Sequence, residues 1–116
     1  MLFIELVKHL IDTAFGALTD PTRRRIVSLL SEKPRRAGEL HDAFEISKPA
    51  VSRHLRVLRE NGLIEELKVA EDGRVRLYRL RPEPLEEVRD WLDEVARNWQ
   101  TALESFKSYV EKGATE

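Results

Sequence analysis

Apolar residues recur at intervals of three and four near both ends of the chain, which is the spacing of a helix that buries one face. Residues 3–18 show this pattern as a broad stripe. From Pro84 onward the intervals alternate between three and four over four heptads, which predicts one long helix with a narrow seam for a second helix. The seam positions are Leu85, Val88, Leu92, Val95, Trp99, Ala102, Phe106 and Tyr109.

Three shorter helices are predicted between the terminal ones. The first begins at Asp20 and Pro21, because aspartate can accept hydrogen bonds from the free N–H groups of a first turn and proline has no N–H to leave unpaired. This helix stops before Pro34, and its buried residues are Ile26, Leu29 and Leu30. The second, AGELHDAF at residues 37–44, lacks a capping residue and contains a glycine, so its start is weak.

The third of these helices spans residues 47–61 and divides into two distinct faces. Ser47 caps its start, and Asn61 and Gly62 end it in a left-handed turn. Its buried stripe, at i, i+4 and i+7, is Val51, Leu55 and Leu58. A rotation of about 100° per residue turns the polar residues away from that stripe. These outward residues are Lys48, Ser52, Arg56 and Arg59, with Arg53 near the edge.

Two β-rich runs, LIEELKV at 63–69 and VRLYRLR at 75–81, follow this helix. Asp72 and Gly73 lie between them and favour a tight turn, so a β-hairpin is predicted. The fold class is therefore mainly α with one small β-hairpin.

The charge of the chain is unevenly distributed, although the formal net charge is only −1. Residues 21–60 hold ten lysines or arginines against five acids, whereas residues 82–116 hold four against nine. A basic middle can attract a polyanion while the acidic end keeps the rest of the chain away from it, so the distribution favours nucleic-acid binding.

Composition excludes several classes of function. Cysteine is absent, which excludes disulfides and thiolate metal sites and fits a reducing compartment. No apolar run approaches the roughly 18 to 20 residues that span a bilayer, so no membrane partner is expected. Acid pairs such as Glu86 and Glu87 are splayed on a helix, and no glycine-rich phosphate loop or Ser–His–Asp setting is present. We therefore expect neither an enzyme nor a cofactor.

The order of helix, helix, helix, turn, helix, hairpin and long helix is that of a winged helix-turn-helix domain. ALTDPTRRRIVSLL, AGELHDAFEISKPAVSRHLRVLRENGLI and DGRVRLYRL occur in that order and resemble the ArsR (SmtB/ArsR) family of bacterial and archaeal repressors. The resemblance covers about Ala14 to Leu80, and each motif alone would be weak. The last helix, with Trp91-Leu92 and Asn98-Trp99, is similar to a metal-independent subgroup that includes autorepressors.

The resemblance implies a homodimer that represses transcription from an inverted-repeat operator in double-stranded DNA, in the cytoplasm and nucleoid of a prokaryote. One domain, 1–116, would comprise a dimerisation helix (1–18), a winged core (20–81) and a second dimerisation helix (82–112). The helix at 47–61 would lie in the major groove. The implied DNA contacts are Ser47, Lys48, Pro49, Ser52, Arg53 and Arg56, with Arg74 or Arg76 from the wing. The implied dimer contacts are Phe3, Leu6, Leu10, Leu85, Val88, Leu92, Val95, Trp99, Phe106 and Tyr109.

The chain departs from the metal sensors of that family. Those proteins use cysteines in the third helix, or histidines and acids in the last one, whereas here no histidine follows His54. Metal sensing is therefore disfavoured, and the effector remains open. His54, beside Leu55, is expected to pack or to form a hydrogen bond rather than to contact a base. The alternative function is a winged-helix module that binds protein and not DNA.

Overall fold

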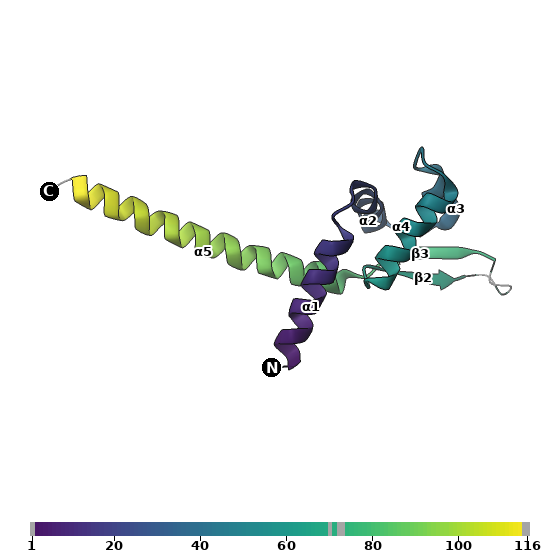
Figure 1. Cartoon of the computed structure of the whole chain (residues 1–116), viewed down its shortest axis with the longest axis horizontal. Helices are drawn as coiled ribbons and strands as arrows, with labels where there is room; N and C mark the ends of the chain where they lie inside the picture. Colours follow the sequence, from purple (N-terminus) through teal and green to yellow (C-terminus); the bar gives the residue numbers. More distant parts are fainter. Residues whose placement is uncertain (1, 70, 72–73, 115–116) are drawn as a thin grey trace.

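The computed structural model describes residues 2–69, 71 and 74–114. Within these residues the helices and the hairpin follow the order expected from the sequence (Figure 1). The bounds are α1 (Leu2–Ala17), α2 (Pro21–Glu32), β1 (Arg35–Arg36), α3 (Ala37–Asp42), α4 (Lys48–Glu60), β2 (Ile64–Lys68), β3 (Arg76–Leu80) and α5 (Pro82–Ala114). One additional short strand, β1, lies between α2 and α3.

The core forms where α2, α3 and α4 meet the sheet and the first turns of α5. The stripe predicted for α4 is confirmed, since Val51, Leu55 and Leu58 are each at most 3% exposed. The other buried apolar residues are Ala14, Ala17, Ile26, Leu30, Leu40, Leu63, Ile64, Tyr78 and Val88. This packing fixes which face of α4 remains in water.

The predicted hairpin is present but belongs to a three-stranded antiparallel sheet of order β1-β3-β2. Glu66 lies opposite Tyr78 in the β2–β3 ladder, and Arg35 lies opposite the same tyrosine in the β1–β3 ladder. The sequence did not predict β1, because a strand of two arginines is too short to show alternation. The predicted turn at Asp72 and Gly73 lies outside the described residues.

Local signals account for the helix ends. Asp20 Oδ1 accepts hydrogen bonds from the backbone N–H groups of Thr22 (2.8 Å) and Arg23 (3.1 Å), which confirms the predicted cap of α2. Gly62 has a φ of 75°, the left-handed value that glycine adopts without a Cβ clash, and α4 ends there. Asn61 precedes it with a φ of −93°, so the left-handed conformation belongs to the glycine alone.

The helix predicted at residues 37–44 is α3, which is shorter than expected and ends at Asp42. The start of α3 is partly capped, because a Glu39 side-chain oxygen accepts a hydrogen bond from the backbone N–H of Arg36 at 3.3 Å. Phe44 lies beyond the helix, where the Arg25 guanidinium stands 5.3 Å from its ring centroid. This cation–π contact holds the connection between α3 and α4 against α2.

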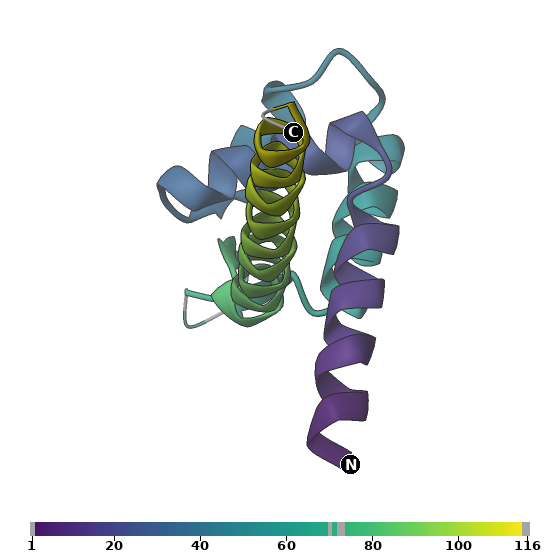
Figure 2. The same cartoon turned by 90° about the vertical axis from the view of Figure 1, so that its left-hand side faces the viewer.

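The last helix is much longer than the domain that it leaves. α5 contains 33 residues, and the molecule measures 77 × 37 × 21 Å along its principal axes. Figure 1 shows α5 running away from the other elements, with α1 crossing only its first part. In Figure 2, which looks along α5, the N-terminal end of α1 projects beyond the rest of the domain.

Two of the residues expected in the dimer interface pack within the chain. Val88 is only 9% exposed in the core, and Leu85 packs against that core. The first turns of α5 therefore use the seam to attach the helix to the domain of the same chain. The rest of the predicted set on α5 is exposed: Leu92, Val95, Trp99, Phe106 and Tyr109.

Candidate nucleic-acid interface

The face of α4 opposite its buried stripe is polar and open to solvent. All six residues that the sequence placed there as DNA contacts are exposed: Ser47, Lys48, Pro49, Ser52, Arg53 and Arg56. The Ser47 hydroxyl oxygen also accepts a hydrogen bond from the backbone N–H of Ala50 at 3.2 Å, so the residue caps the helix as predicted. Its hydroxyl hydrogen remains available as a donor.

The cations on this face differ in whether a carboxylate already neutralises them. Within the described part of the chain, Lys48, Arg53 and Arg56 have no ion-pair partner. Arg59, one turn further along, is bound at 2.5 Å to a carboxylate oxygen of Glu66 on β2. The N-terminal two-thirds of α4 therefore carries the uncompensated positive charge.

Glu66 connects the end of α4 to the sheet. Its carboxylate is only 14% exposed and accepts from Arg59 and, at 3.3 Å, from Arg76 of β3. The Tyr78 hydroxyl lies 3.5 Å from the same carboxylate. Burial raises the pKa of Tyr78, and the negative charge of Glu66 raises that pKa further. The tyrosine therefore stays neutral and acts as a hydrogen-bond donor at this junction.

The two wing arginines consequently have different settings. Arg76 is 59% exposed but paired with Glu66, so part of its charge is already compensated within the chain. Arg74 is exposed at the edge of the hairpin, where it lines a crevice with Arg36, Gly38 and Arg76. Of the two candidate contacts on the wing, Arg74 is the one that lies nearer the tip.

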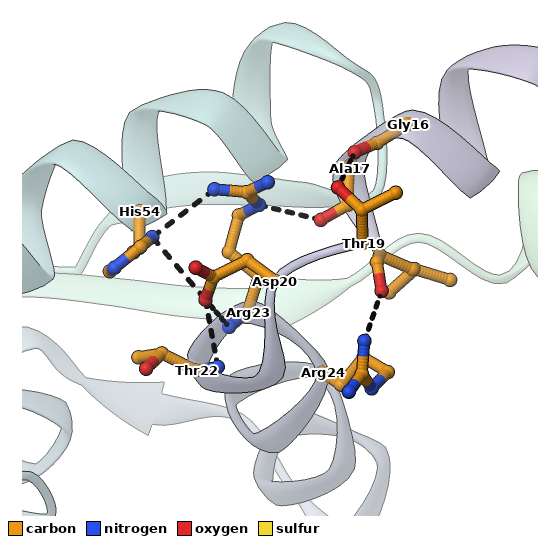
Figure 3. Close-up of polar contacts among 9 residues, drawn as sticks. Gly16, Ala17, Thr19, Asp20, Thr22, Arg23, Arg24 and His54 are labelled. Atoms are coloured by element: carbon orange, nitrogen blue, oxygen red, sulfur yellow. Dashed lines mark hydrogen bonds and ion pairs between the residues drawn. The ribbon is translucent and has the colours of Figure 1, made fainter.

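A second polar network joins α4 to α2 and to the end of α1 (Figure 3). Arg23 donates from Nε to the carbonyl oxygen of Ala17 at 2.6 Å, and its Nη1 lies 3.3 Å from Nδ1 of His54. Because a guanidinium can only donate, this contact requires Nδ1 of His54 to act as the acceptor. The expected hydrogen-bonding role of His54 is confirmed, and the histidine faces α2 rather than solvent.

Asp20 completes this network beside its capping bonds. Its Oδ1 lies 3.9 Å from Nδ1 of His54. Burial by itself would raise the pKa of Asp20, but the hydrogen bonds from the backbone N–H groups of Arg23 and Thr22 and the positive charge of Arg23 outweigh it, so the pKa falls below its ordinary value. The ionised carboxylate therefore belongs to the folded arrangement that positions α4.

Sequence reasoning did not find the roles of Arg23 and Glu66. Arg23 stands in the quoted DPTR motif, but 31 positions separate it from His54, and no local pattern links residues so far apart. The sequence assigned no role to Glu66. The one available signal was its place as an acidic residue on the core-facing side of a strand, where a charge needs partners.

Among residues 2–69, 71 and 74–114, no three His, Cys, Asp or Glu side chains gather in a way that could hold a metal ion. In the same residues, no helix combines the length and apolar character needed to cross a membrane.

A helix-turn-helix whose second helix carries uncompensated cations, followed by a β-hairpin, defines a winged helix-turn-helix DNA-binding domain. The family model of bacterial regulatory proteins of the arsR family matches residues 20–66, which run from the α2 cap to Glu66. Together with relatives that are more than 30% identical over most of its length, this match shows that the chain belongs to the ArsR family of transcriptional regulators.

The relatives agree with this assignment. The HTH-type transcriptional regulator Rv2034 of Mycobacterium tuberculosis is 38% identical over 86% of this chain and 88% of its own length. The transcriptional repressor SdpR of Bacillus subtilis is 33% identical over 70% of this chain and 87% of its own. An ArsR-like transcriptional regulator from Rhodococcus sp. RHA1 superposes with a TM-score of 0.69 at 29% identity, over 85% of this chain and 91% of that one. These relatives are regulators of transcription and not enzymes.

Proposed function

We propose that this regulator is a homodimeric repressor that inserts α4 of each protomer into the major groove of an inverted-repeat operator. The observation that carries the proposal is the outward face of α4, where Lys48, Arg53 and Arg56 are exposed and, among the described residues, unpaired. A major groove admits an α-helix and displays base edges that arginine can distinguish. The name of the relative SdpR, a transcriptional repressor, supports repression rather than activation.

Each residue of this face has a role that its chemistry allows. Arg53 and Arg56 can bind guanine O6 and N7 in bidentate fashion or hold a phosphate, and Lys48 suits a phosphate because it is a compact point charge. Ser47 and Ser52 can donate to phosphate or to base edges. Arg74 would contact the phosphate backbone of the DNA beside the groove. Arg76 would contact it while remaining paired with Glu66.

The dimer would use the exposed apolar faces of the two terminal helices. Phe3 and Leu6 of α1 are 74% and 56% exposed, and Leu10 continues their line toward the domain. Exposed apolar area of this extent on two neighbouring helices marks a protein interface. A two-fold dimer presents two α4 helices, which predicts half-sites about 34 to 36 Å apart or a multiple of that distance.

Substituting the α4 arginines tests the DNA contacts. We expect Arg53→Ala and Arg56→Ala each to weaken binding in a gel shift on the chain's own upstream region. A lost guanine contact should cost about 1 to 3 kcal/mol and relax base preference at one position. A lost phosphate contact should weaken all sequences alike and reduce the salt slope by about one.

Arg97→Ala provides a control of equal charge change, because Arg97 lies on α5, far from α4, and off its apolar seam. Binding by this variant should equal that of the parent. If the chain only binds protein, DNA affinity will be negligible both before and after the α4 substitutions.

A further inference from the structure

The short strand β1 separates two neighbouring arginines. Consecutive side chains of a strand point to opposite faces. Arg35 lies toward α2, where its guanidinium binds a carboxylate oxygen of Glu32 at 2.7 Å. Arg36 is exposed and, among the described residues, has no ion-pair partner. The charge of Arg36 is therefore available to a partner outside the chain.

Arg36 lies at a crevice between the start of α3 and the wing. It is opposite Leu77 in the β1–β3 ladder, so the same register continued would set residues 37–39 opposite residues 74–76. Instead the chain turns into α3 at Ala37. The two segments therefore diverge and leave a gap of about 310 Å³, lined by residues 36–39 and 74–76, which we call the α3–wing crevice.

The α3–wing crevice is cationic. Three arginines line it, Arg36, Arg74 and Arg76, against one acid, Glu39. The Glu39 carboxylate already accepts a hydrogen bond from the backbone N–H of Arg36, and Arg76 is partly neutralised by Glu66 at 3.3 Å. Like charges gathered around one gap repel each other, and an anion placed in the gap relieves that repulsion. A phosphate fits this setting, because guanidinium groups present donors in a fork that matches phosphate oxygens.

The place of the crevice in the fold indicates which phosphate can reach it. The helix α3 is the first of the helix-turn-helix, and in this motif the first helix crosses the DNA backbone while the second lies in the groove. Figure 1 shows α3, α4 and the hairpin together at the end of the molecule away from α5. A duplex that takes α4 into its major groove therefore brings its phosphate backbone to the start of α3.

We propose that the α3–wing crevice is a phosphate-binding site, which holds one backbone phosphate of the operator outside the bases read by α4, with Arg36 as its main ligand. This inference rests on the function proposed above and adds a DNA contact that neither α4 nor the sequence-predicted wing residues provide. A phosphate carries no base identity, so the site fixes the position of the protein on the duplex without adding sequence preference.

The two arginines of β1 provide a matched pair of variants. Arg36→Gln removes one charge at the crevice, and Arg35→Gln removes the same charge from the other face of the strand. In fluorescence anisotropy, Arg36→Gln should make the slope of log affinity against log salt shallower by about 0.9, because one phosphate contact is lost. The advantage of the parent over this variant then shrinks about 3.5-fold between 50 and 200 mM salt. Arg35→Gln and Arg36→Lys, which retains a cation at the crevice, should keep the parent slope.

Duplexes that carry a single uncharged methylphosphonate linkage locate the phosphate. The parent should lose affinity when this linkage replaces the phosphate that reaches the crevice. Arg36→Gln should lose nothing further at that position, although it should still lose affinity at the phosphates that α4 contacts. Circular dichroism checks that each variant is folded, and Arg97→Ala replaces Arg35→Gln as the control if the latter unfolds.

The inference would be overturned if Arg36→Gln kept the parent slope, or if a folded Arg35→Gln lowered the slope equally. It would also fail if the parent and Arg36→Gln lost affinity at the same set of linkages. In each case, parent binding that Arg53→Ala weakens would leave the proposed function standing. A folded parent that binds no duplex at low salt would instead remove the proposed function together with this site.

Discussion

At the scale of single residues, two carboxylates lie at the contacts that hold α4 against the rest of the domain, one beside His54 in the middle of the helix and one beside Arg59 near its end. Asp20 caps α2 and stands beside the Arg23–His54 contact, and Glu66 binds the arginine at the far end of α4. Both carboxylates receive hydrogen bonds from charged or backbone donors, which compensates the cost of holding a charge away from water. The orientation of α4 is thus set by polar contacts in addition to its apolar stripe.

Asp20 should make the stability of the chain depend on pH in the acid range. Its pKa in the folded chain lies below the ordinary value of 3.8, so the ionised form stabilises the fold above that value, and the contribution is lost as the pH falls through the folded pKa. Asp20→Asn keeps an oxygen acceptor for the cap but removes the charge. Urea unfolding should find the parent more stable than Asp20→Asn at about pH 7, with the difference disappearing in strong acid.

Two further variants complete this experiment. Asp20→Ala also loses the cap and should cost about 1 kcal/mol more at neutral pH. Asp42→Asn, at the exposed end of α3, changes the same charge without touching the network and serves as the control. A difference between the parent and Asp20→Asn that stays constant from neutral to strongly acid pH would contradict the role given to the carboxylate.

At the scale of elements, the sequence predicts what is local. The caps at Asp20 and Ser47, the left-handed glycine and the stripe of α4 all follow from neighbours within a few residues. The strand β1 could not be predicted, since Arg35 and Arg36 pair only because β3 offers a free edge to them. The packing of Leu85 and Val88 against the core could not be predicted either. A heptad pattern shows that a helix has an apolar face, but it does not show whether the same chain or another chain covers that face.

Gly62 offers a test of the turn that joins α4 to the wing. A Cβ added at this position would meet no heavy atom within 4 Å, so Gly62→Ala bears only the backbone cost of a φ of 75°. That cost is about 1 to 2 kcal/mol in the free energy of unfolding. Gly38→Ala in α3 has equal space and a helical backbone, so it should be neutral or stabilising by up to about 1 kcal/mol. Equal effects of the two substitutions on thermal or urea unfolding would contradict the role of the left-handed turn.

At the scale of the whole molecule, the cationic face of α4 belongs to the winged core, and the long helix α5 extends away from that core. The first half of α5 is acidic and its second half is faintly basic. The outward residues of α4 were predictable from the sequence because one helix provides both the buried and the exposed face. The networks of Arg23 and Glu66 were not, since their partners are distant in sequence. A local group of exposed, unpaired cations on α4 can attract DNA even though the net charge of the chain is −1, because the distribution of charge matters more than its sum.

We propose that two protomers together read one operator through α4, and the salt dependence of DNA binding is the measurement that tests this proposal. Fluorescence anisotropy with a duplex of the chain's upstream region, at several salt concentrations, gives both the stoichiometry and the number of phosphates neutralised. We predict two chains per duplex and a logarithm of the affinity that falls linearly with the logarithm of salt, by about 0.9 for each phosphate contacted. Absence of binding at low salt by a folded dimer, or one chain per duplex with an affinity insensitive to salt, would show that the protein does not read an operator in this way.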